Sequence, residues 1–535
     1  MRPILRGAAA LLAAPTLALS ALVATSAPAS AAIDPAPGAA AGSWLGAQLQ
    51  GSDWIVHNQE YDFDDYGLTI DAALALDVAG DPDEVVGSIS DALAAEVDSY
   101  VSPGWGTNLS AGAVAKALVL ADTTGDDPTS YGGRNLVTDL EGQVATEGAI
   151  AGRIQDDWDS GDPYAADYAN VLGQAFAVEG LDALDSASTD AVTAFLLDQQ
   201  CSDGSFRLTF ADVEAADQTC DGGNGLPSVD ATAQAVDSLQ SQLDDAEVAQ
   251  HVEDAVDWLL DEQNADGSFG SDADIPAGNA NSTGLAAYAL MISDQAEAAT
   301  HAAAWLRAHQ VTNLADCVTY DAGDVGAVTY DDTALAAAQD GAMEPSLVDQ
   351  SVRASAQGLL GLVAAQAGDP RAMFTAEYVK AGGNKPVGVG AAAPGEALCA
   401  VAGGQSAFGY ADVDGDATLR VKVPSKTGTT VVDVANADGI FDTIEINALG
   451  KTDLKVKVKK QKVKKGKKQK VTVKGLAPAE SVTVKLGKKS KSGQATRKGV
   501  YTAKLKVTGK PGKTTVKVKG QFGNRTGKQT FRVTK

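Results

Sequence analysis

The sequence predicts three domains, a closed double ring of helices followed by two small β sandwiches. The string FLLDQQCSDGSF at residues 195–206 recurs as WLLDEQNADGSF at residues 258–269, and repeats of this period indicate stacked helical units. After Gly368, helical spacing gives way to strand-like alternation. The charge reverses as well: residues 32–370 hold 6 Lys+Arg and 59 Asp+Glu, whereas residues 451–535 hold 28 and 2.

The first 31 residues are typical of a secretion signal. Arg2 and Arg6 give a basic start, an uncharged Ala-rich and Leu-rich run follows, and Ala29-Ser30-Ala31 offers a small-residue cleavage pattern. We therefore expect a signal peptide at residues 1–31. No later stretch is apolar for long enough to span a bilayer. The sequence thus predicts a secreted protein that is extracellular or associated with the cell wall.

Helical spacing fills residues 32–370. Six amphipathic segments each precede a segment rich in Ala and Gly, whose small side chains let helix backbones approach closely. Six such pairs favour closure into a ring, with a final helix at residues 346–366 sealing the seam; a linear solenoid, the alternative, would need capping repeats. The expected outer helices are 43–48, 82–97, 136–144, 188–200, 246–263 and 297–310, and the inner helices are centred on Thr69, Ala111, Val171, Thr232, Thr283 and Thr333.

Two copies of a β unit follow the helices. The string at residues 393–396, APGE, corresponds to APAE at residues 477–480. This spacing predicts two immunoglobulin-like sandwiches, at residues 371–450 and 451–535. In the second, alternation places Val and Leu inward and Lys outward. The Lys face either protects sheet edges against aggregation or contacts an anionic cell-wall polymer or membrane surface.

Four cysteines in an oxidising compartment indicate two disulfides. Cys201 and Cys220 bracket one loop and are expected to pair, which leaves Cys317 for Cys399. No metal or cofactor is expected. Zinc would need free thiolates beside histidines, and the chain has only 4 His. The acidic body also argues against a nucleic-acid partner. The segment 412–416, DVDGD, lacks the closing Glu of a calcium loop and is interpreted as a hairpin turn.

The repeated motif carries a resemblance. Trp258-Leu259, Gln263 and Gly267-Ser268-Phe269 resemble the QW repeat of squalene and terpene cyclases. The six-pair organisation is similar to the alpha/alpha toroid superfamily of prenyltransferase/squalene oxidase repeat proteins. The resemblance implies an (α/α)6 toroid whose outer layer the motif braces. It also implies one enzymatic alternative, a terpene-cyclase-like reaction in which an Asp of a DxDD motif is the general acid. Residues 62–65, DFDD, match literally, and DD at 331–332 is a near match, so Asp64 or Asp331 would be the donor.

Binding is the preferred hypothesis. In a closed ring the inner helices all point the same way, so their N-terminal ends and preceding loops form one mouth. Asp, Asn and aromatic side chains together are typical of a polar ligand site. A non-catalytic module for a small molecule, peptide or glycan is therefore expected, and a structural surface protein without ligand is the remaining alternative. The candidate mouth residues are Asp64, Asp65, Tyr66, Trp105, Asn108, Asp167, Tyr168, Asn170, Asp230, Asn279, Asn281, Tyr330, Asp331 and Asp332.

Overall fold

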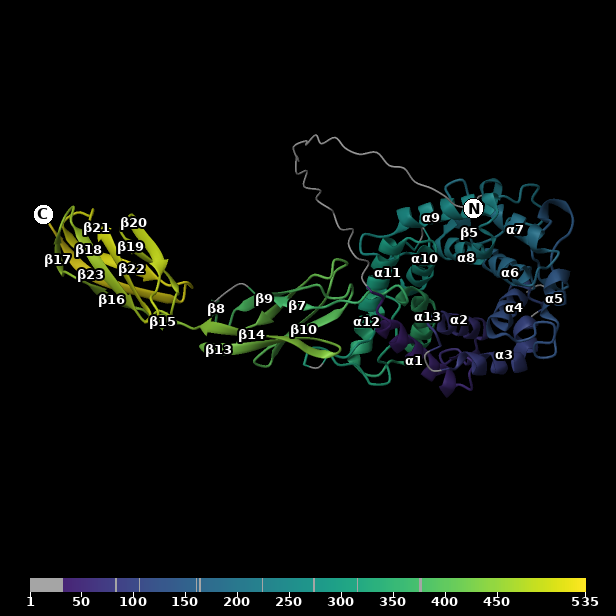
Figure 1. Cartoon of the computed structure of the whole chain (residues 1–535), viewed down its shortest axis with the longest axis horizontal. Helices are drawn as coiled ribbons and strands as arrows, with labels where there is room; N and C mark the ends of the chain where they lie inside the picture. Colours follow the sequence, from purple (N-terminus) through teal and green to yellow (C-terminus); the bar gives the residue numbers. More distant parts are fainter. Residues whose placement is uncertain are drawn as a thin grey trace, which may run out of the picture.

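A computed structural model describes residues 32–81, 84–104, 106–159, 161–162, 165–223, 225–272, 275–314, 316–374 and 378–535. A ring of helices forms one end of the molecule, and two β domains follow it in line (Figure 1). The expected signal peptide, residues 1–31, lies outside the described residues. Within the described parts, no helix is both long and apolar enough to cross a membrane.

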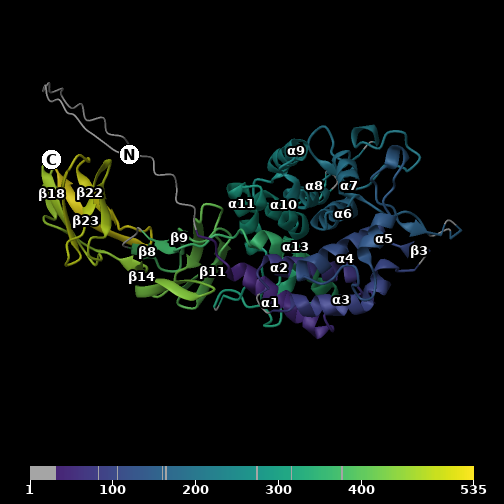
Figure 2. The same cartoon turned by 45° about the vertical axis from the view of Figure 1, so that its right-hand side comes forward.

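Twelve helices form the two layers of the ring (Figure 2). Each inner helix packs on the next, in the order α2, α4, α6, α8, α10 and α13, and α13 returns to α2. This closed order confirms the toroid. The outer helices are α1 (Ala36–Gly51), α3 (Val86–Val101), α5 (Leu136–Gly142), α7 (Thr189–Leu197), α9 (Ala246–Glu262) and α11 (Ala296–Ala308). The inner helices are α2 (Tyr66–Val78), α4 (Ala111–Thr124), α6 (Val171–Ala183), α8 (Val229–Ser238), α10 (Ala280–Ile292) and α13 (Pro345–Leu362).

The sixth inner helix differs from the prediction. The segment around Thr333 forms only the short helix α12 (Asp332–Ala337), which ends in a 3-10 turn at Ala338–Asp340. The helix expected to seal the seam, α13, instead takes the sixth inner position. The physical reason is length and surface: α13 runs for 18 residues from Pro345 and carries a stripe of buried Ser, Ala and Gly that α12 lacks.

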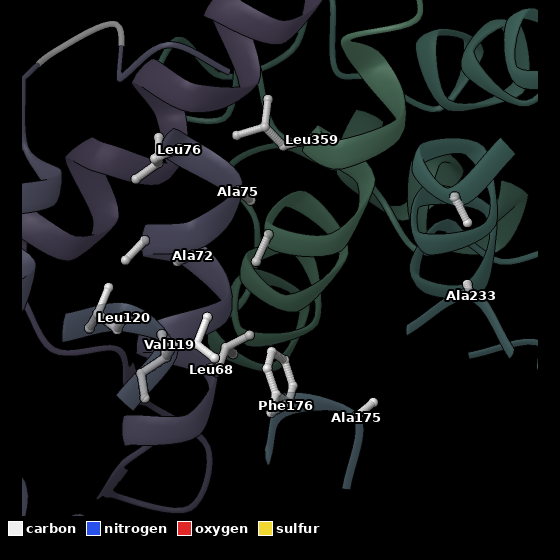
Figure 3. Close-up of a cluster of buried hydrophobic side chains, with 14 of the residues drawn as sticks. Leu68, Ala72, Ala75, Leu76, Val119, Leu120, Ala175, Phe176, Ala233 and Leu359 are labelled. Atoms are coloured by element: carbon white, nitrogen blue, oxygen red, sulfur yellow. The ribbon is translucent and has the colours of Figure 1, made fainter. Parts of the chain in front are cut away.

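Small residues bring the inner helices into close contact. Figure 3 shows part of one buried cluster, which includes Ala72 and Ala75 of α2 together with side chains of α4, α6, α8 and α13. At the contact between α10 and α13, a Cβ on Gly284 would lie 2.1 Å from the carbonyl oxygen of Gln357. Only glycine permits that approach. The Ala-rich and Gly-rich composition of the inner segments therefore sets the diameter of the ring.

On four of the six inner helices, one hydroxyl accepts a hydrogen bond from the loop that precedes an inner helix. Thr69 Oγ1 accepts a hydrogen bond from Val56 N at 2.9 Å, Thr232 does so from Phe206 N at 2.8 Å, and Thr283 does so from Phe269 N at 2.9 Å. Ser355 Oγ plays the same part on α13, accepting from Val328 N at 2.9 Å. This repeated bond independently identifies α13 as the sixth inner helix.

Each motif glutamine ties its turn to the next outer helix. Gln263 Nε2 donates to Gly267 O at 3.1 Å and to Ala298 O at 2.9 Å. Gln200 Nε2 bonds Gly204 O and His251 O in the same way. Gln310 Nε2 donates to Gly326 O at 3.1 Å and to Pro37 O at 2.8 Å, and Pro37 belongs to α1. The last motif thus bonds the first helix and closes the outer layer.

Short strands and turns fill the loops before the inner helices. The strands form three two-stranded sheets, β1 with β2, β3 with β4 and β5 with β6; β1 and β2 form a hairpin, whereas β3 and β4 come from loops on either side of α4 and α5. Their bounds are β1 (His57–Asn58), β2 (Phe63–Asp64), β3 (Thr107–Leu109), β4 (Asp157–Trp158), β5 (Phe206–Arg207) and β6 (Pro227–Ser228). Further 3-10 turns are Gly148–Ile150, Asp221–Gly223 and Gln240–Gln242.

The first β domain packs a sheet ordered β11-β10-β13-β14-β8 beside a sheet ordered β12-β9-β7. Its buried core includes Val387, Leu398, Val421 and Val432. Two sheets around one core make it a sandwich, as predicted. The strands are β7 (Arg371–Met373), β8 (Tyr378–Lys380), β9 (Asn384–Gly390), β10 (Ala397–Ala402), β11 (Gln405–Tyr410), β12 (Ala417–Lys422), β13 (Gly428–Asn436) and β14 (Gly439–Leu449).

The second sandwich follows the predicted alternation. Its sheets are ordered β15-β23-β22-β19-β20, with β17 beside β23, and β16-β18-β21. Along β18, Val471 and Val473 are buried, whereas Lys468, Lys470 and Lys474 are exposed. The strands are β15 (Thr452–Asp453), β16 (Lys455–Val458), β17 (Lys462–Lys464), β18 (Lys468–Lys474), β19 (Ser481–Leu486), β20 (Lys489–Gln494), β21 (Val500–Lys506), β22 (Gly512–Lys519) and β23 (Arg525–Thr534).

Both predicted disulfides are present. Cys201 pairs with Cys220 inside the ring domain. Cys317, from the loop after α11, pairs with Cys399 of β10 and so links the ring to the first sandwich. Leu314 and Ala397 pack beside this bond in a small apolar cluster. The covalent link and the cluster together hold the sandwich against the ring.

Candidate functional site

Four of the fourteen predicted mouth residues cap helices, three at the starts of inner helices and Asp331 at the start of α12. Each cap accepts a hydrogen bond from the backbone N–H three residues later, which satisfies one of the free donors of the first turn. The acceptors are Asp65 from Leu68 N at 2.9 Å, Asn170 from Gly173 N at 3.1 Å, Asn279 from Ser282 N at 3.0 Å and Asp331 from Ala334 N at 2.9 Å.

Other predicted residues are engaged elsewhere or exposed. Asp167 pairs with Arg153 at 2.7 Å. Tyr66 packs against Tyr100 of α3, with ring centroids 6.1 Å apart. Asn108 lies exposed on β3, and Tyr168 is also exposed. Trp105 lies outside the described residues.

The two aspartates proposed as proton donors do not lie in an enclosed chamber. Asp64 is on the β1–β2 hairpin, half exposed, and bonds His57 Nδ1 at 2.9 Å. That bond raises the pKa of His57. Asp331 caps the short helix α12, and Asp332 is 97% exposed and contacts His309. A general acid for an alkene needs a dry apolar site, so these positions do not support the cyclase alternative.

Three of the predicted residues meet at one cavity. Asp65, Asn281 and Tyr330 line a pocket of about 520 Å³ at the N-terminal ends of α2, α10 and α13. Its remaining polar lining comes from Asn58, Glu60, Ser346, Asp349, Gln350 and Arg353. We call this cavity the mouth pocket. Its volume falls in the range of ordinary ligand sites.

Charged residues of α13 organise the mouth pocket. Arg353 pairs with Asp65 at 2.9 Å. Asp349 accepts hydrogen bonds from Gln59 N at 3.0 Å and Glu60 N at 2.9 Å, which fixes the β1–β2 hairpin beside the cavity. Sequence reasoning missed these residues because it assigned α13 to the seam instead of the inner ring. The bond from Ser355 to Val328 is the signal that places α13 among the inner helices.

Two buried acceptors at this end of the ring have no partner within the described chain. They are Asn281 Oδ1 and Asp230 Oδ1. Burial raises the pKa of Asp230, and a hydrogen bond with Ser282 opposes that shift. Burial also raises the pKa of Tyr330, helped by the charges of Asp331 and Asp230. Buried acceptors without donors are costly. Of the two residues only Asn281 lines the mouth pocket, and its free oxygen suits the pocket to a ligand that donates hydrogen bonds.

The described residues hold no group of three or more His, Cys, Asp or Glu side chains placed to bind a metal ion. What the mouth pocket offers is therefore direct recognition: acceptors from Asn281 and the carboxylates, one guanidinium and one phenol. Such a set orients a polar ligand by hydrogen bonds.

Comparison with known proteins bears on the ring. The family model "Prenyltransferase alpha-alpha toroid domain" matches residues 135–323. No curated protein matches the chain. The ring is similar in structure to the type II terpene cyclase MstE from Scytonema, at 15% identity and a TM-score of 0.41 over 62% of this chain and 98% of that one. It is also similar to a protein from Actinoplanes, at 17% identity and a TM-score of 0.41 over 62% and 99%.

A third similar structure is an unsaturated glucuronyl hydrolase from Bacillus sp. GL1, responsible for the degradation of glycosaminoglycan. It is 14% identical, with a TM-score of 0.42 over 61% of this chain and 95% of that one. The family match confirms the resemblance seen in the repeated motif. Across residues 135–323 the chain is therefore similar to the prenyltransferase alpha-alpha toroid domain.

Proposed function

We propose that the protein is an exported, envelope-associated binding protein whose mouth pocket holds a hydrogen-bond-donating ligand. A glycan or another hydroxyl-rich small molecule fits best, and a peptide is the second choice. The basic sandwich, residues 451–535, would hold the ring near an anionic wall polymer or membrane surface. The proposed domain boundaries are residues 32–370, 371–450 and 451–535, with a signal peptide before them.

The observation that carries this proposal is one unpartnered acceptor in the lining of the mouth pocket. Asn281 Oδ1 is buried and lacks a donor among the described residues. A sugar hydroxyl supplies such a donor and can also accept from Arg353 or Tyr330, which line the same cavity as Asn281. Tyr61 and Phe63 are exposed residues of the β1–β2 hairpin, which borders the pocket. Their aromatic rings add apolar surface of the kind that sugar rings contact.

Export is supported by the leader-like first 31 residues and by the two disulfides. Disulfides persist in oxidising compartments. The exposed lysines of the second sandwich lie on its strand faces, opposite a Val-rich core. This excess of one charge exceeds what solubility requires, which favours contact with an anionic surface.

The test uses the mature chain, residues 32–535, and thermal unfolding. The ligand panel contains tetra-N-acetylglucosamine, maltotetraose and tetra-alanine. We expect one oligosaccharide to raise the melting temperature, because a ligand that binds only the native state stabilises it by mass action. Asn281→Ala is expected to weaken that ligand about tenfold, the value of roughly one hydrogen bond.

The matched control is Asn108→Ala, because Asn108 is an exposed asparagine outside the pocket. It should bind as the unmodified chain does. Stabilisation by the peptide alone would shift the proposal to a peptide ligand. A panel without any effect, or an equal loss in both variants, would contradict the mouth pocket as the binding site.

A further inference from the structure

A second cavity lies on the axis of the ring, deeper than the mouth pocket. All six inner helices line it, and its volume is about 130 Å³. Several of the residues that line it occupy equivalent positions along their helices. Glu179 and Asp237 each lie nine residues after the cap of their helix, Asn170 and Ser228. Tyr288 lies nine residues after Asn279 in the same way. These side chains therefore form one layer of the ring, which we call the axial chamber.

The axial chamber concentrates negative charge. Asp71, Asp77, Glu179 and Asp237 line it, and Asp122 lies close enough to act on Glu179. Lys116 is the nearby cation, but its Nζ lies 2.5 Å from Asp71 and also donates to Gly67 O at 2.9 Å. It is therefore already neutralised. The remaining carboxylates have no basic partner among the described residues.

The helix ends add to this charge. The chamber lies in the C-terminal halves of the inner helices, where the helix dipole is negative. Helices usually place Lys, Arg or His there. None of the inner helices α2, α4, α6, α8, α10 and α13 has a basic residue in its last turn. The protein itself thus leaves this end of the axis without a compensating cation.

Asp237 supplies an independent observation. Protein surrounds its carboxylate, and Asp237 lines the chamber. Glu179 Oε2 accepts from Ser238 at 3.3 Å, but within the described chain the carboxylate of Asp237 makes no hydrogen bond or ion pair. Burial raises the pKa of Glu179 to about 8 and that of Asp237 to about 6. Both shifts reflect the missing positive partner.

We propose that the axial chamber binds a small organic cation with a primary ammonium group, held by Asp237 and Glu179. An ammonium group donates three hydrogen bonds, and Asp237, Glu179 and Gln234 provide acceptors on adjacent helices. Leu74, Leu285 and Leu360 form an apolar wall for a short alkyl stem. A bare metal ion fits less well, because no group of three or more acidic, His or Cys side chains in the described residues is placed to ligate one.

Calorimetric titration of the mature chain at pH 8 with n-butylammonium chloride tests the proposal. Sodium chloride, calcium chloride and tetramethylammonium chloride serve as control titrants, since the last has no N–H donor. Asp237→Asn and Glu179→Gln are each expected to weaken n-butylammonium binding at least tenfold. Asp190→Asn is the matched control, because Asp190 is exposed on the outer helix α7. It should keep full affinity, as should Asn281→Ala at the mouth pocket.

Misfolding is not expected to obscure the result. Both buried carboxyls disfavour the folded state when charged, so the amide variants should melt at or above the temperature of the unmodified chain. Affinity should rise from pH 6 to pH 9, by at most about tenfold per pH unit, because Glu179 must lose a proton to pair with the cation. The other titratable groups in or near the chamber that can act on this pH dependence are Asp71, Asp77, Lys116, Asp122, Asp237 and Tyr288.

Four results would overturn the proposal. One is unchanged n-butylammonium affinity in Asp237→Asn. Another is equal affinity for tetramethylammonium, which would reduce the chamber to nonspecific charge attraction. The third is calcium binding tighter than the ammonium ion, which would replace an organic cation with a metal. Absence of any heat above the sodium chloride titration would also refute it.

Discussion

The substitution Gly267→Ala should destabilise the ring by about 2–3 kcal/mol. Gly267 has φ +91°, and a Cβ there would lie 2.3 Å from the carbonyl oxygen of His301 on α11. The left-handed backbone alone costs an alanine about 1–2 kcal/mol. The turn must also move away from α11, which breaks the bond from Gln263 to Ala298 O and removes about 1 kcal/mol.

Gly80→Ala separates the cost of the left-handed backbone from the cost of losing the contact with α11. Gly80 has φ +84° and nothing within 4 Å of its would-be Cβ. It should lose only the backbone share, about 1–2 kcal/mol. Urea unfolding followed by tryptophan fluorescence reads the ring alone, because all 6 Trp lie between residues 44 and 305. Equal losses in Gly267→Ala and Gly80→Ala would refute the idea that the motif turn is clamped against the next outer helix.

Two further predictions concern charge. The pKa of Glu179, raised to about 8 by burial, means that unfolding releases its proton between about pH 5 and 8, so stability falls as pH rises through that window. Glu179→Gln should reduce the decline of the free energy of unfolding there by at most about 1.4 kcal/mol per pH unit, as measured by urea unfolding across that pH range; an unchanged slope would contradict a buried, protonated Glu179. The mature chain should bind purified cell wall at low salt and be released as sodium chloride screens the lysines of residues 451–535. Retention that ignores salt would contradict electrostatic attachment.

Repetition made the fold predictable. Two copies of one motif located the outer helices, and the Ala-rich segments between them located five inner helices. The prediction of the sixth inner helix was wrong. The DD pair before Thr333 is typical of a helix start, but whether a long helix forms depends on how far the apolar pattern continues after that start. The apolar run after Thr333 stops within six residues, whereas Pro345 begins a helix of 18. The length of a helix in a folded protein depends on how much of its apolar face packs against other helices, and a short sequence segment does not specify that packing.

The site was less predictable than the fold. The Asp and Asn residues at the helix starts mainly cap, as elementary helix chemistry requires, and only Asp65, Asn281 and Tyr330 line the mouth pocket. The axial carboxyls were not expected at all. Glu179 and Asp237 look like ordinary polar positions in Ala-rich helices, and their shared spacing from the caps gains meaning only when the ring places them in one layer.

The closure of the ring makes its two ends neighbours. Ala367 N donates to Ala32 O at 2.8 Å, and Asp34 N donates to Ala365 O at 2.8 Å. During synthesis, α1 and α2 therefore remain without their partner α13, which begins more than 260 residues later in the sequence. Such a topology has high contact order and folds slowly. The same adjacency makes the ring suitable for circular permutation, since joining residues 32 and 367 and opening another turn would keep every helix beside its present neighbours.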